Sequence, residues 1–254
     1  MTLLSLEGVT RRYGGLVAVD TIDLDVAEGG VTAVIGPNGA GKTTLFNLVS
    51  GFQTPNAGRI VFAGEDITTR LPEQIAASGL VRTFQLVQLF QNLSVLENVQ
   101  VGCHLHTRGG VFSALIRNRA TRETEREVDT RARELLHLVG LEGAAESEAS
   151  ALAYGQQRLL EIARALAAKP KLLLLDEPAA GLSADESKRL SAAIRDIARR
   201  GTTVLLIEHD MKLVMNTADT IAVMDFGRKI AEGTPAAIRE NPAVITAYLG
   251  AGHA

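Results

Sequence analysis

The stretch that decides the fold reads Gly36-Pro37-Asn38-Gly39-Ala40-Gly41-Lys42-Thr43. It follows the apolar run Val31–Ile35, which predicts a short buried strand. It precedes Thr44–Ser50, which predicts a helix that ends at Gly51. Glycines in such a loop let successive backbone N–H groups point at phosphate oxygens, and the helix N-terminus adds partial positive charge. The stretch therefore predicts a phosphate-binding loop between a strand and a helix.

Two side chains at the end of this loop have the chemistry to bind a nucleoside triphosphate. Lys42 is expected to reach the β- and γ-phosphates, and the Thr43 hydroxyl is expected to ligate Mg²⁺. The alternative is a glycine-rich turn without this function, and the Lys-Thr pair after an apolar strand disfavours it. The predicted nucleotide site spans the loop from Gly36 to Thr43 and includes Thr44.

A second apolar run, Leu172–Leu175, ends in two carboxylates, Asp176 and Glu177. Side chains alternate along a strand, so these two carboxylates should diverge at its end. Asp176 suits the Mg²⁺ shell, and Glu177 suits orienting or deprotonating an attacking water. Buried strands often end in an acidic residue, so this interpretation depends on its pairing with the glycine loop.

His209 follows the next apolar run, Val204–Ile207. A lone histidine at a strand end is usually structural. Parallel strands, however, bring their carboxyl ends to one edge of a sheet, where ligands bind. His209 is therefore expected to contact the γ-phosphate. The remaining histidines lack such placement and are expected to be structural or solvated: His104, His106, His137 and His253.

The order of predicted elements indicates an α/β core with a helical insertion. The alternation of Ile22, Leu24 and Val26 with aspartates predicts an early half-buried strand. The pattern becomes helical from about Leu71 to Ala168. The last third alternates, with elements predicted at Lys171–Leu175, Ala184–Arg199, Thr202–Ile207, Met211–Asn216 and Thr220–Met224. Such alternation implies right-handed crossovers and a parallel sheet.

Composition sets broader limits on fold and partners. The chain has 254 residues, 46% of them hydrophobic, and a net charge of −3. This length and apolar fraction fit one large domain or two small ones and exclude wholesale disorder. A mildly acidic chain has no bulk attraction to nucleic-acid phosphates or anionic lipid heads.

Smaller features restrict the class further. No apolar run is long enough to cross a membrane, and the N-terminus does not resemble a secretory signal, so we expect a cytoplasmic chain. The single cysteine, Cys103, excludes an internal disulfide. Its side chain is expected to pack in the interior rather than to act as a nucleophile. Mixed charges over Arg117–Glu134 predict a solvated helix face rather than a binding patch.

Together these residues resemble an ATP-binding-cassette (ABC) transporter ATPase subunit over nearly the whole chain. Walker A is Gly36–Thr43, and Walker B is Leu172–Asp176 followed by Glu177. Leu152–Gln157 resembles the signature motif. Four further motifs of the family match, in the family's order along the chain: Tyr13 as the adenine-stacking aromatic, Gln85 as the Q-loop glutamine, Ala180–Ser183 as the D-loop and His209 as the switch histidine.

The resemblance implies a P-loop NTPase (RecA-like) core with an N-terminal antiparallel β subdomain and an inserted helical subdomain. One ABC ATPase domain would span 1–254, with core and β subdomain at about 1–84 and 159–254 and the helical subdomain at about 85–158. The implied catalytic residues are Glu177, His209 and Gln85. The implied cofactors are ATP and Mg²⁺, with Thr43, Gln85 and Asp176 as metal ligands.

The resemblance also implies partners. Such subunits pair head to tail, and Ala153, Tyr154, Gly155 and Gln156 would then complete the γ-phosphate cage of the partner. The second ATP-binding subunit would be another chain or a second copy of this one. Transmembrane permease subunits and a periplasmic binding protein complete the implied system, without nucleic acid, at the cytoplasmic face of the inner or plasma membrane.

Two departures from the family pattern and three further stretches refine the resemblance. Ala153 stands where the signature serine is usual, and Ser183 where the D-loop usually has Asp. The further stretches, Gly79–Gln85, about His104–Glu134 and Gly233–Gly250, resemble the longer ATPase subunit of branched-chain amino acid importers. The alternatives are an importer of urea or amides, an exporter, or a non-transport ABC ATPase. A P-loop kinase or GTPase does not explain the signature segment, Gln85 and His209 together.

Overall fold

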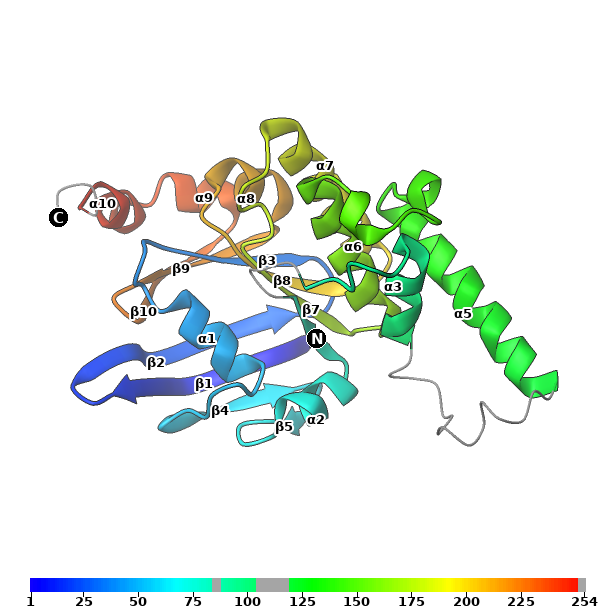
Figure 1. Ribbon diagram of the computed structural model, residues 1–254. Helices are drawn as coiled ribbons and strands as arrows, with labels where there is room; N and C mark the ends of the chain where they lie inside the picture. Colours follow the sequence, from blue (N-terminus) through cyan, green and yellow to red (C-terminus); the bar gives the residue numbers. More distant parts are fainter. Residues whose placement is uncertain (84–87, 104–118, 251–254) are drawn as a thin grey trace. The chain divides into compact units, whose positions relative to one another are not determined.

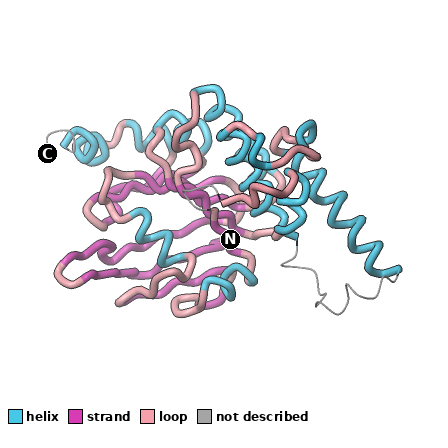
Figure 2. Tube along the Cα trace, in the orientation of Figure 1, coloured by secondary structure: helices cyan, strands magenta, loops and turns pink. Residues whose placement is uncertain are grey.

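The computed structural model describes residues 1–83, 88–103 and 119–250 (Figures 1 and 2). Contacts divide the chain into two compact units, one formed by 1–85 with 171–254 and the other by 86–170. The division expected from the sequence placed residues 159–170 with the core, whereas the contacts keep the helix that contains most of them within the second unit. Among the described helices, none has the length and apolarity required to cross a membrane.

A six-stranded sheet organises the first unit. Its order is β10-β9-β3-β8-β7-β6. Strands β9, β3, β8, β7 and β6 run parallel, and β10 pairs antiparallel with β9 at the edge. The bounds are β3 Val31–Ile35, β6 Leu80–Arg82, β7 Leu172–Asp176, β8 Thr203–Ile207, β9 Thr220–Asp225 and β10 Arg228–Gly233. Every residue of β3, β7 and β8 is buried, as expected for strands covered on both faces. The predicted parallel sheet is confirmed.

A four-stranded antiparallel sheet of order β2-β1-β4-β5 accompanies it. The bounds are β1 Thr2–Tyr13, β2 Leu16–Ala27, β4 Ala57–Phe62 and β5 Glu65–Asp66. In β2, Ile22, Leu24 and Val26 are buried while the intervening aspartates are exposed, as the alternation predicts. Helix α1, Lys42–Val49, lies between the two sheets, and its apolar side chains join both in one core (Figure 1).

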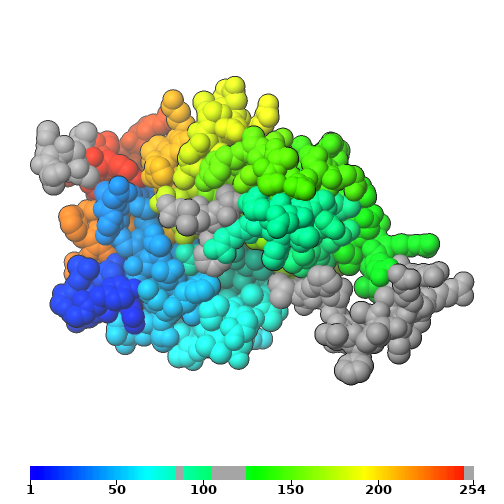
Figure 3. Space-filling model, in the orientation of Figure 1, coloured from blue at the N-terminus to red at the C-terminus, as the bar shows by residue number. Residues whose placement is uncertain are grey.

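Segments from both ends of the chain share this first unit. Figure 3 shows the early strands, in blue, beside the C-terminal strands, in orange. The contact is specific, because the Asp20 backbone N–H donates to the Gly227 carbonyl at 2.8 Å and Arg228 pairs with the Asp20 carboxylate at 2.7 Å. Contacts between residues about two hundred positions apart in the sequence therefore help to hold the first unit together.

Further helices cover the six-stranded sheet or extend its edge. Their bounds are α2 Pro72–Ala77, α7 Ala184–Arg199, α8 Met211–Thr217, α9 Pro235–Arg239 and α10 Pro242–Gly250. Helix α7 buries Leu190, Ile194 and Ile197 on one face and contacts β8 and β3. Its N-terminus is fixed by a capping box, in which Ser183 and Glu186 exchange side-chain and backbone hydrogen bonds.

The second unit is helical in its described part. It contains α3 Val95–Cys103, α5 Arg119–Leu138 and α6 Tyr154–Ala167, and α3 packs against both others. Charged side chains of α5 from Glu125 to Glu134 are largely exposed, while Leu135 and Leu136 are buried, so the predicted solvated face is confirmed over its described part. Cys103 is buried, and burial raises the pKa of its thiol, which disfavours the reactive thiolate.

Candidate nucleotide site

The glycine loop joins β3 to α1 in a conformation that only glycine supports. Gly36, Gly39 and Gly41 have φ angles of 153°, 80° and 98°. A Cβ atom at Gly36 would lie 2.0 Å from the Met224 carbonyl oxygen, and one at Gly41 would lie 2.2 Å from that of Ala18. These contacts leave no room for a side chain at Gly36 or Gly41, because the backbone of neighbouring strands lies directly against the loop. Helix α1 begins at Lys42, two residues earlier than predicted.

Lys42 turns back into this loop. Its ammonium group donates to the carbonyl oxygens of Gly36 at 2.7 Å and Pro37 at 2.9 Å, and the residue is 6% exposed. Burial lowers the pKa of Lys42, and the charges of Glu177 and Asp176 oppose that shift. The loop therefore holds a cation close to two carboxylates, with the exposed Thr43 next in the helix.

The two carboxylates diverge at the end of β7, as predicted. Asp176 is 4% exposed and directs its Oδ2 toward Arg82. Glu177 has a φ of 45°, which is unusual for a residue with a Cβ atom, and its Oε2 lies 3.7 Å from Nδ1 of His209. One carboxylate thus faces the interior, and the other meets the predicted switch histidine.

Arg82, the last residue of β6, was not predicted as part of the site. Its Nη2 lies 2.7 Å from Asp176 Oδ2, and its Nη1 donates to Asn47 at 2.8 Å and Ser50 at 2.9 Å. Its side chain is 6% exposed, and its guanidinium carbon lies 5.8 Å from the ring centres of both Phe46 and Phe52. Arg82 therefore links the Asp176 carboxylate to the C-terminal end of α1.

A second unpredicted residue, Glu208, directly precedes His209, the predicted switch histidine. Its carboxylate is 0% exposed and accepts backbone N–H groups from Ala179 at 2.7 Å, His209 at 2.9 Å and Asp210 at 3.2 Å. A single side chain thus joins the loop after Glu177 to the loop that carries His209. Its position directly after an apolar strand was the one signal that the sequence offered.

Tyr13 ends β1 opposite Leu16, the first residue of β2. Its hydroxyl bonds to the Gln53 side-chain oxygen, and the Arg11 guanidinium lies 4.9 Å from the ring centre. The residue is 40% exposed. Since β2 also places Ala18 against Gly41, the predicted adenine-stacking residue is on the hairpin that borders the phosphate loop.

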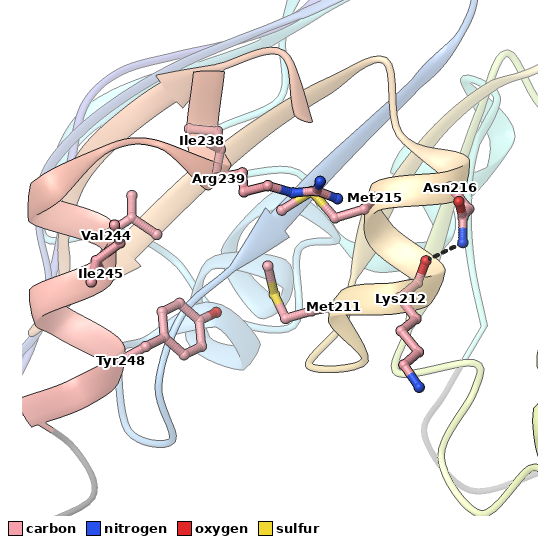
Figure 4. Close-up of a pocket in the computed structure, with 9 residues that line it drawn as sticks. All are labelled: Met211, Lys212, Met215, Asn216, Ile238, Arg239, Val244, Ile245 and Tyr248. Carbon is pink, nitrogen blue, oxygen red and sulfur yellow. Dashed lines mark hydrogen bonds between the residues drawn. The ribbon is translucent and has the colours of Figure 1, made fainter. Parts of the chain in front are cut away.

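The C-terminal helix α10 packs against β10 and α9. Burial raises the pKa of Tyr248. Tyr248 also lines a cavity of about 430 Å³ formed by α8, α9 and α10, with Met211, Met215 and Arg239 among its other walls (Figure 4).

The signature segment belongs to the second unit. Ala153 is the N-cap of α6 and has no side-chain cap, and its backbone N–H donates instead to the Gln156 side chain at 3.1 Å. Gly155 is buried, while Ala153, Tyr154 and Gln156 are exposed. Gln85, predicted as a catalytic and metal-binding residue, lies outside the described residues.

Comparison with known proteins agrees with this geometry. Residues 19–180 match the family model described as ABC transporter, and residues 228–254 match that of the branched-chain amino acid ATP-binding cassette transporter. The chain belongs to the ABC transporter family.

Individual relatives match this ABC cassette over 98% of its length. It is 47% identical to the high-affinity branched-chain amino acid transport ATP-binding protein LivG of Salmonella typhimurium and also 47% identical to BraF of Pseudomonas aeruginosa, each over 98% of both chains. The crystal structure of MJ1267, an ATP-binding cassette of an ABC transporter in its ADP conformation, superposes with a TM-score of 0.85 at 32% identity, covering 98% of this chain and 99% of that one. The predicted fold class is confirmed, and the cassette is an ATP-binding ATPase of a transporter.

Proposed function

We propose that this cassette energises the import of branched-chain amino acids. The observation that carries the proposal is the 47% identity to LivG over 98% of both chains, together with the C-terminal match at residues 228–254. The ATP-binding subunit does not touch the cargo, so its sequence reports the substrate through kinship. Its own chemistry is the hydrolysis of ATP.

We propose a role in that hydrolysis for each of the predicted site residues. The N–H groups of the glycine loop and the Lys42 ammonium bind the β- and γ-phosphates. Glu177 accepts a proton from the attacking water as the bond from water oxygen to γ-phosphorus forms and the bond to ADP breaks. His209, 3.7 Å from Glu177, binds the γ-phosphate, and Tyr13 stacks on adenine. Gln85 is proposed to approach the same phosphate.

The donor atoms of the site fit Mg²⁺. The Thr43 hydroxyl and the Asp176 carboxylate supply the hard oxygen ligands that this ion prefers, and Mg²⁺ typically combines one or two carboxylates with substrate phosphates. We propose that these two residues, with Gln85, hold the ion, which neutralises phosphate charge when bound. Arg82 fixes one oxygen of the same Asp176 carboxylate.

Two cassettes are proposed to act as a pair, with ATP between them. Ala153, Tyr154, Gly155 and Gln156 of one cassette would close the γ-phosphate site of the other, so that ATP binding favours the pair and hydrolysis releases it. The partner is a second ATP-binding subunit or a second copy. Permease subunits and a periplasmic binding protein complete the system, and the cassette is peripheral on the cytoplasmic face of the membrane.

Paired uptake and hydrolysis measurements test the proposal. Cells lacking this chain should lose uptake of radiolabelled leucine, and wild type should restore it while Glu177→Gln should not. The purified Glu177→Gln variant should bind ATP, form a dimer on size-exclusion chromatography and hydrolyse ATP at a small fraction of the wild-type rate. Loss of urea or acetamide uptake with normal leucine uptake would refute the substrate, and near-normal turnover would refute the role of Glu177.

A further inference from the structure

Glu208 is a buried carboxylate with no role in the hydrolysis just described. It directly follows β8, and its side chain is 0% exposed. Among the described residues, the basic side chain that comes within 4.0 Å of its carboxylate is that of His209, with Nδ1 at 3.9 Å. A carboxylate without solvent is costly unless hydrogen bonds satisfy it. Here backbone amides do so.

The two oxygens of Glu208 serve different loops. Oε1 accepts the Ala179 N–H at 2.7 Å, on the loop that follows the Walker B strand. Oε2 accepts the N–H groups of His209 and Asp210 at 2.9 and 3.2 Å, on the loop that follows β8. These are charge-assisted hydrogen bonds, about twice as strong as neutral ones. The carboxylate is therefore a clamp between two loops that start on neighbouring strands.

Each clamped loop carries one partner of the Glu177–His209 pair. Glu177 has a φ of 45°, and such strained backbone persists only where its surroundings over-determine it. Its N–H donates to the Ile207 carbonyl at 3.0 Å, which holds one side of the turn, and the Ala179–Glu208 bond holds the other. The same carboxylate fixes the backbone of His209.

We propose that Glu208 is a positioning residue that sets the distance between Glu177 and His209. The inference rests on the proposed function of these two residues in ATP hydrolysis. Glu208 itself is not proposed to contact the nucleotide. The clamp acts on kcat because it orients the base and the histidine, whereas the glycine loop that binds phosphate is held by other contacts.

Glu208→Gln tests the clamp with little change in shape. The amide keeps one acceptor oxygen and places an NH₂ group against an N–H donor, so one loop loses its partner. We expect kcat to fall by about tenfold to a hundredfold, because even a small misplacement of catalytic groups lowers the reaction rate by such factors. The KM for ATP and the affinity for a fluorescent ATP analogue should change by less than about threefold. Glu208→Asp, one methylene shorter, should also lower kcat.

Asp219→Asn is the matched control. Its carboxylate also accepts a backbone amide, that of Val31 at 2.8 Å, but at the start of β3 rather than beside the catalytic pair. We expect it to leave kcat within about twofold of wild type even where its melting temperature falls. Equal loss of kcat in both variants, or unchanged kcat in Glu208→Gln, would overturn the proposal.

A double-mutant cycle separates positioning from an independent effect. If Glu208 acts through Glu177, Glu208→Gln should cause little further loss of single-turnover rate in a Glu177→Gln background. Fully additive losses would contradict the proposal. Absence of ATP hydrolysis by the wild-type chain would instead refute the proposed function, so the two failures are distinguishable.

Discussion

Replacing Arg82 by Met removes the cation from a buried ion pair. The side chains of Arg82 and Asp176 are 6% and 5% exposed, and their charged atoms lie 2.7 Å apart. Removing one partner of such a pair leaves an uncompensated buried charge and costs about 3–5 kcal/mol. That is a large part of the roughly 5–15 kcal/mol that stabilises most proteins. At about 2–4 °C per kcal/mol, the melting temperature should fall by roughly 6–20 °C.

Denaturant unfolding of three variants measures this effect. Arg59→Met is the control. Arg59 pairs with Asp66, both side chains are about half exposed, and surface ion pairs contribute little to the free energy of unfolding. The double variant Arg82→Met/Asp176→Asn carries no buried charge at this position and should recover about half or more of the lost stability. The reasoning is refuted if Arg82→Met matches Arg59→Met, or if the double variant is no more stable than Arg82→Met.

Three further predictions concern the nucleotide site and the surface. Lys42→Ala should weaken ATP binding by roughly ten- to a hundredfold, measured with a fluorescent analogue, because it removes a charged phosphate donor; unchanged affinity would contradict its role. Ala153→Ser supplies the missing cap of α6 and should raise stability by about 0.5–2 kcal/mol without lowering ATPase activity; a severe loss of activity would show that the alanine is required. The Thr68 hydroxyl and backbone and Arg59 lower the pKa of Asp66 from 3.8 to about 2, so its stabilisation is complete above pH 3.8 and is lost as the pH falls through 2. The stability difference between wild type and Asp66→Asn should therefore close over that range in acid unfolding, and a constant difference would argue against the shift.

Local patterns were sufficient to predict β3, β7 and β8, whereas β6, which carries Arg82, lies in the stretch from about Leu71 to Ala168 that was expected to be helical. Val31–Ile35 forms β3 with the predicted bounds, and the apolar run before Asp176 forms β7. These strands are covered on both faces, so they consist of unbroken runs of apolar residues that can be recognised in the sequence. The glycine loop was predictable for a related reason, because backbone conformations with positive φ restrict the residue type.

Arg82 and Glu208 could not be predicted because their roles arise from pairing between distant segments. Arg82 meets Asp176 across 94 positions, and Glu208 reaches Ala179 across 29. A charged residue at the end of a short strand is common, and nothing local shows that a carboxylate or an amide will face it. The proposed roles of Lys42 and Glu177 are tested by the variants described above.

The position of β3 in its sheet has a consequence for synthesis of the chain. Both of its neighbours, β8 and β9, come from residues 203–225, so the strand that carries the phosphate loop has no partner until most of the chain has left the ribosome. During that interval β3 has two unpaired apolar edges, which are prone to wrong pairing. The antiparallel pair of β1 and β2 can form early. The nucleotide site is therefore among the last parts of this cassette to assemble, although its defining loop is among the first to be made.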